Sequence, residues 1–90
     1  MKKYDAIGIV EVQYFAVALD LLDHMCKAAN VELLVAEKSI GGRLVVIFVG
    51  GSVSDVNIAI ESVTEYGADM PLKMALVIAN PHKEIMRYIV

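Results

Sequence analysis

Glu37-Lys38-Ser39-Ile40-Gly41-Gly42-Arg43 lies near the middle of the chain, between two strongly apolar runs. Residues 33–36 lead into this stretch and residues 44–49 lead out of it. Because glycine reaches the positive φ that tight turns need, a short loop with Gly41-Gly42 between β-type runs predicts a hairpin. The rest of the chain is arranged around this hairpin, with one strand–helix unit before it and one helix–strand unit after it.

Apolar runs and helical periodicity predict the other elements. We expect strands at 4–12, 31–38, 43–49 and 72–79, and a long helix at 14–29. A second long helix is expected to begin after Ser52 or Ser54 and to close at Tyr66-Gly67, and a short terminal helix runs from 82 to about 88. The order strand–helix–strand–strand–helix–strand predicts an α+β fold, in which a four-stranded antiparallel sheet carries both long helices on one face. Ninety residues predict one domain, 1–90.

Several residues carry predictions about element ends. Asn30 is expected to end the first helix in the left-handed conformation, and Gly50-Gly51 to form a strand-to-helix turn. Ser52 or Ser54 can cap the second long helix, and Asn80 is expected to cap the terminal helix, with Pro81 at its first position.

Other side chains carry predictions about packing and pairing. Gly8 inside the first strand suggests a close backbone approach or a kink. Glu11 is either a satisfied carboxylate at a strand end or a subunit-contact group. Cys26 is expected to be a small buried residue. The i,i+4 spacing predicts two surface pairs on the first helix, Asp20–His24 and Asp23–Lys27.

The composition predicts an oligomer. A domain of this size buries roughly 60–65% of the surface of its extended chain, yet 58% of the residues are apolar and the mean hydropathy is +0.61. Some of this apolar surface must therefore be covered by another subunit or lie exposed.

Charge and hydropathy exclude several partners. A net charge of −3 without a basic cluster argues against nucleic acid. No apolar run has the length of a membrane span, no signal-peptide core follows the basic N-terminus, and one cysteine fits a reducing cytosol.

The chain shows no recognisable catalytic motif. The two histidines, His24 and His82, lack partners at metal-ligand spacing, and no serine or cysteine sits in a nucleophile motif. We therefore expect no metal, no cofactor and no enzymatic activity. Two classes of protein fit the surplus apolar surface: a self-assembling structural protein, and a regulatory domain that senses a small molecule between subunits.

Four segments resemble the shell proteins of bacterial microcompartments. Residues 23–31 resemble the family's Asp-x-Met-x-Lys-Ala-Ala-x-Val signature, and the opening stretch resembles its Glu-Lys-Ile-Gly-Ser-Gly loop. Residues 7–11 resemble the Gly-Met-Ile-Glu strand, and 79–82 the Ala/Pro-Arg-Pro-His segment. The four segments occur in the family's order and span nearly the whole chain.

The resemblance implies a non-enzymatic, ferredoxin-like BMC-domain shell protein in the bacterial cytoplasm. It implies cyclic homo-hexamers that tile with neighbouring hexamers and other shell proteins around encapsulated enzymes. Small metabolites would cross a central pore lined by Ser39, Ile40, Gly41 and Gly42. The hexamer-edge residues carried over from the family are Lys27, Asn80, Pro81 and His82. Carboxysomes and several metabolic compartments all fit these residues.

The chain departs from the family pattern at two of these places. The loop reads Ser-Ile-Gly-Gly, so the resemblance implies a pore with fewer hydroxyl groups and with Ile40 beside its narrowest point. Asn80 stands where arginine is common, and its shorter, uncharged side chain predicts a weaker lateral contact.

Overall fold

The computed structural model describes residues 4–38 and 44–89. Within these residues four strands form one antiparallel sheet, in the order β2-β3-β1-β4. The elements in chain order are β1 (Ala6–Gln13), α1 (Phe15–Ala28), β2 (Glu32–Lys38), β3 (Leu44–Gly51), α2 (Val53–Tyr66), β4 (Leu72–Ala79) and α3 (Lys83–Ile89). The predicted α+β fold is confirmed, because this is the expected element order.

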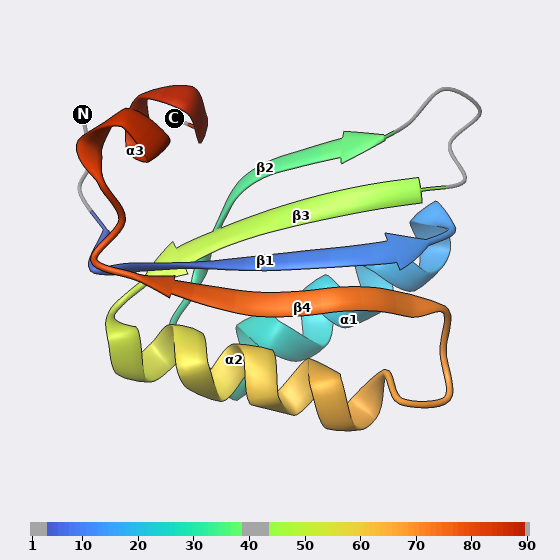
Figure 1. Ribbon diagram of the computed structural model, residues 1–90. Helices are drawn as coiled ribbons and strands as arrows, with labels where there is room; N and C mark the ends of the chain where they lie inside the picture. Colours follow the sequence, from blue (N-terminus) through green and yellow to red (C-terminus); the bar gives the residue numbers. More distant parts are fainter. Residues whose placement is uncertain (1–3, 39–43, 90) are drawn as a thin grey trace.

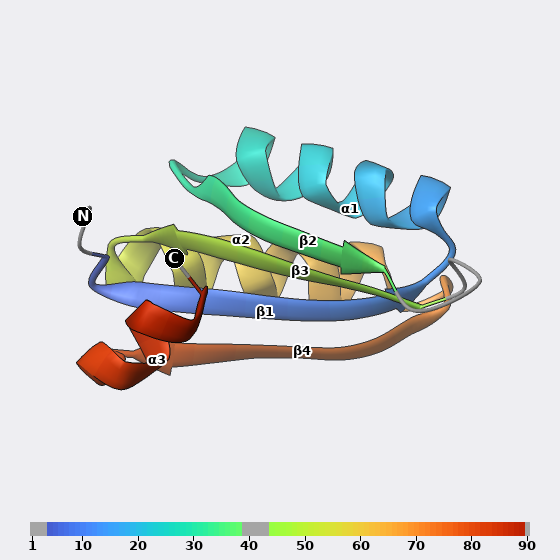
Figure 2. The same ribbon diagram turned by 90° about the horizontal axis from the view of Figure 1, so that it is seen from above.

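Two long helices cover one face of the sheet, and a single short helix lies on the other side. Helices α1 and α2 lie side by side under one face of the sheet, whereas α3 lies on the opposite side near one end (Figure 1). Figure 2 shows the same separation from above, with α1 running beside β2. Both long helices therefore share a face, as predicted.

The core lies between the sheet and these two helices. Successive side chains of a strand point to opposite faces, and Val10 and Val12 of β1 are fully buried toward the helices. Leu21 and Met25 of α1 are fully buried against them. The remaining buried members of this cluster are Ala6, Ala18, Val31, Val45, Ile47, Val49, Val56, Ala59, Ile60 and Val63.

Gly8 lies where Ile60 of α2 packs against the sheet. A Cβ on Gly8 would lie 2.9 Å from Ile60 Cδ1 and 3.0 Å from Val49 Cγ2. Glycine at this position therefore lets Ile60 pack directly onto the strand backbone, which confirms the predicted close approach.

Two predictions about α1 and the segment after it are wrong. The helix ends at Ala28, and Ala29 leaves it in an extended conformation with φ −154°, so Asn30 does not end it in the left-handed region. Cys26 is exposed, so the prediction of a small buried residue is wrong. Its Sγ lies 4.0 Å from the carbonyl oxygen of Val31.

The Gly50-Gly51 prediction is also wrong, because β3 continues through both residues. Gly50 is opposite Ile7 and Gly51 is opposite Ala6 in the ladder with β1. The turn is therefore short, and Ser52 caps α2 as predicted, because its Oγ accepts the backbone N–H of Asp55 at 3.1 Å.

Candidate functional site

The predicted edge residue Lys27 lies on the exposed surface of α1. Its Nζ is 2.7 Å from Asp23 Oδ2, and about 76% of its side chain is exposed. This hydrogen bond, together with the negative charge of Asp23, raises the pKa of the Lys27 ammonium. The predicted Asp23–Lys27 pair is confirmed, and it leaves two of the three ammonium protons directed to solvent.

The predicted Asp20–His24 pair is wrong, because Tyr66 of α2 contacts both side chains. The Tyr66 hydroxyl donates to Asp20 at 3.0 Å, and the phenol ring stacks on His24 with centroids 4.1 Å apart and planes at 4°. This contact joins the two long helices across 46 residues of sequence. Helical spacing within α1 gives no signal for it.

The hydrogen bond from Tyr66 to Asp20, followed by the charge of Asp20, raises the pKa of the Tyr66 phenol. The stabilisation is therefore present below the unfolded pKa of about 10 and is lost as pH rises through the higher folded pKa. We expect Tyr66→Phe to lower the melting temperature at pH 8 and the deficit relative to wild type to shrink above pH 10. Thermal unfolding from pH 8 to 11 measures this, and a deficit that does not change with pH would contradict it.

The predicted edge residues Asn80, Pro81 and His82 form the corner between β4 and α3. Asn80 adopts φ 49°, in the left-handed region, and its N–H donates to the carbonyl of Asp5 at 2.7 Å. The prediction that Asn80 caps α3 is wrong. His82 accepts two hydrogen bonds at the start of α3. Its backbone carbonyl accepts the N–H of Ile85 at 2.9 Å, and its side-chain Nδ1 accepts the N–H of Glu84 at 3.1 Å.

The predicted pore residues Ser39, Ile40, Gly41 and Gly42 lie outside the described residues. The strands on either side of them are paired as expected, with Lys38 of β2 opposite Val45 of β3.

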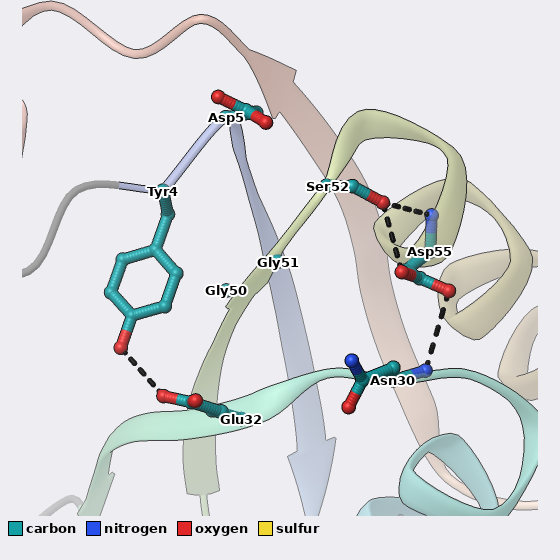
Figure 3. A pocket seen from close by; sticks show the side chains of 8 residues that line it. All are labelled: Tyr4, Asp5, Asn30, Glu32, Gly50, Gly51, Ser52 and Asp55. Carbon is teal, nitrogen blue, oxygen red and sulfur yellow. Dashed lines mark hydrogen bonds between the residues drawn. The ribbon is translucent and has the colours of Figure 1, made fainter.

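A hollow of about 260 Å³ lies where β1 and β2 begin and β3 ends (Figure 3). The Tyr4 hydroxyl donates to Glu32 at 2.8 Å, and its ring packs so closely that a Cβ on Gly50 would lie 2.7 Å from Tyr4 Cδ1. Asp55 accepts from Ser52 Oγ at 2.9 Å and from the Asn30 N–H at 3.3 Å. This acidic lining disfavours a phosphate.

The sheet face opposite α1 and α2 is largely apolar. Alternation along the strands and the ladder registers place two rows of side chains across it. We call the eight residues of these rows the open face. One row is Val35, Phe48, Ile9 and Leu76, and the other is Glu37, Val46, Glu11 and Met74.

Helix α3 covers only one end of this side of the sheet (Figures 1 and 2). Ile7 and Met86 are buried there, outside the main core cluster. Beyond α3, Phe48 and Val46 line an open hollow together with the end of α3. The open face therefore presents apolar side chains that the described part of the chain covers only in part.

The family model for the BMC domain matches residues 6–81, which comprise the whole sheet and both long helices. The chain belongs to the BMC-domain family. The match confirms the family resemblance drawn from the four sequence segments.

Other BMC-domain proteins resemble the chain over most of its length. It is 36% identical over 86 residues to the carboxysome shell protein CsoS1A of Hydrogenovibrio crunogenus, covering 89% of this chain and 84% of that one. It is 37% identical over 81 residues to the microcompartment shell protein PduT of Citrobacter freundii, covering 90% of this chain and 43% of PduT.

A solved structure shows the same fold. The match to a microcompartment protein from Desulfitobacterium hafniense DCB has a TM-score of 0.81 at 25% identity, and covers 97% of this chain and 47% of that one. The BMC-domain fold therefore accounts for almost the whole chain.

The described residues contain no group of three or more His, Cys, Asp or Glu side chains arranged to hold a metal ion. No helix among them is long and apolar enough to cross a membrane.

Proposed function

We propose that the chain is a non-enzymatic shell protein of a bacterial microcompartment, located in the cytoplasm. Its copies form cyclic hexamers that tile with other hexamers and other shell proteins around encapsulated enzymes. Ser39, Ile40, Gly41 and Gly42 line the central pore through which small metabolites pass. Membership of the BMC-domain family and its carboxysome and microcompartment shell relatives support this proposal.

The observation that carries the proposal is the partly exposed open face. Phe48, Val46 and Leu76 are only half-buried, and Met74 is 49% exposed. A contiguous apolar surface of this kind typically marks a protein interface. A ring in which every copy covers the open face of the next one removes this surface from water, as expected of a head-to-tail assembly.

Electron microscopy together with mass measurement by light scattering tests the proposal. We expect six-membered rings that merge into sheets or tubes as the concentration rises. A dimer, trimer or tetramer that grows no further would contradict the shell function and would favour a ligand-sensing domain instead.

The proposed edge between hexamers contains Lys27 and the β4–α3 corner. A lysine stem can lie along an apolar surface while its ammonium reaches carbonyl groups of a neighbouring hexamer. The β4–α3 corner contributes Asn80, Pro81 and His82 to the same proposed edge. Asparagine tolerates the left-handed conformation better than most residues, so φ 49° gives a structural reason for Asn80 where arginine is common.

We expect Lys27→Ala to leave the ring intact and to abolish sheets, because the exposed ion pair with Asp23 contributes little to folding. Negative-stain microscopy scores sheets, and light scattering scores ring mass. Lys73→Ala, which removes an exposed lysine of β4, is the matched control. Sheets of normal extent from Lys27→Ala would show that Lys27 serves only as half of a surface pair.

A further inference from the structure

Glu11 is an unusual residue within the open face. It lies inside β1, opposite Val46 of β3 on one side and Met74 of β4 on the other. Its side chain is half-buried, and it has no hydrogen bond or ion pair with any residue in 4–38 or 44–89. Covering a carboxylate with an apolar surface is costly unless the cover brings a hydrogen-bond donor or a cation. Whatever covers the open face should therefore carry a positive charge.

A second surface of the same chain combines exposed apolar side chains with a positive charge. Phe15 and Leu19 of α1 and Leu33 of β2 are 43%, 50% and 46% exposed. Lys38 Nζ lies 4.4 Å from the centre of the Phe15 ring. We call Phe15, Leu19, Leu33 and Lys38 the α1–β2 patch.

The α1–β2 patch lies on the helix side of the sheet. Leu33 and Lys38 are opposite Val49 and Val45, which point toward the helices. Figure 2 shows α1 running beside β2, the strand at this edge of the sheet. The patch and the open face are therefore different surfaces, so each copy could contact one neighbour through each of them.

We propose that the α1–β2 patch of one copy covers the open face of the next, and that Lys38 pairs there with Glu11 across the subunit contact. Opposite charges within two apolar surfaces make the pairing specific. The inference deepens the proposed ring by naming the two surfaces in contact and the ion pair between them.

Lys38 fits this role better than Lys27 or Arg87, because each of those two side chains already pairs with a carboxylate of its own helix. Lys27 pairs with Asp23 at 2.7 Å and Arg87 pairs with Glu84 at 3.0 Å. Lys38 instead contacts an aromatic ring, an arrangement that leaves its protons available to a carboxylate.

Charge reversal tests the pair. Glu11→Lys places a second ammonium against Lys38, and Lys38→Glu places a second carboxylate against Glu11. Each variant alone should therefore require at least about ten-fold more protein to form rings. An equimolar mixture should restore rings of wild-type mass. When the two variants alternate around the ring, every contact between positions 38 and 11 pairs one lysine with one glutamate. Native mass spectrometry should show both variants within one ring.

Glu61→Lys is the control for the change in net charge, since Glu61 is exposed on α2 outside both surfaces. It should form rings as wild type does. If a reversed variant fails to fold by circular dichroism, Glu11→Gln, Lys38→Gln and their double variant decide the question. The two neutral substitutions should weaken the ring non-additively, whereas additive effects would overturn the pair.

The outcomes separate this inference from the proposed function. Suppose that the wild-type protein forms rings. If the single variants then assemble normally, or if their mixture does not form rings of wild-type mass, the Glu11–Lys38 contact is overturned and the shell function still stands. A wild-type protein that forms no ring overturns the shell function itself.

Discussion

Phe48→Asp should convert the assembled ring into a folded monomer. Phe48 lies in the all-apolar row of the open face, between Val35 and Ile9, and is half-buried within one chain. In the monomer the new carboxylate can remain in water, so the fold should survive. In the ring it would lie against apolar side chains without a cation, which costs about 3–5 kcal/mol at each contact. The dissociation constant of each contact should rise more than about a hundred-fold.

Light scattering across a concentration series measures this effect, with thermal unfolding as the check on the monomer. Phe48→Leu keeps the site apolar and should still form rings. Ile58→Asp is the matched control, because it places the same charge at a 46% exposed side chain of α2. Rings from Phe48→Asp at wild-type concentration would show that the open face is not the subunit contact.

Element positions were predicted well where the sequence contains strong local signals. Strand β4 has the expected bounds because Pro71 precedes it and Asn80-Pro81 follows it. Ser52 caps α2 because its hydroxyl is in reach of the Asp55 N–H. These signals act within a few residues, so they do not depend on the rest of the fold.

The predictions failed where contacts distant in sequence decide the structure. Gly50 and Gly51 resemble a turn, yet the ladder with β1 extends β3 through both of them. Tyr66 contacts Asp20 and His24 across the two helices, and no spacing within α1 indicates this.

The candidate site was predictable to a similar extent. Lys27 lies on an exposed helix surface, which a hexamer-edge role requires, and that role stays a prediction. The sequence left Glu11 as either a strand-end carboxylate or a contact group, and only the register places it between Val46 and Met74. The roles of Ser39, Ile40, Gly41 and Gly42 stay predictions.

Gly8→Val should destabilise the fold itself. The first added carbon would lie 2.9 Å from Ile60 Cδ1 and 3.0 Å from Val49 Cγ2, and the two methyl groups need further space. Gly8 is buried under α2, so Ile60 must move outward or α2 must shift. Overpacking of this kind costs about 1–3 kcal/mol. The higher strand propensity of valine offsets less than about 1 kcal/mol of this.

The second-site variant Ile60→Ala provides the decisive control. Alone it should destabilise the protein by about 2–5 kcal/mol, because it leaves a cavity above Gly8. In the double variant, valine at position 8 can occupy part of that cavity, so the loss should be smaller than the sum of the two single losses by more than about 0.5 kcal/mol. Urea unfolding of Phe48→Asp, Gly8→Val/Phe48→Asp, Ile60→Ala/Phe48→Asp and the corresponding triple variant measures this without interference from assembly. Strictly additive losses would show that Gly8 is required for a reason other than the close packing of Ile60 on the strand.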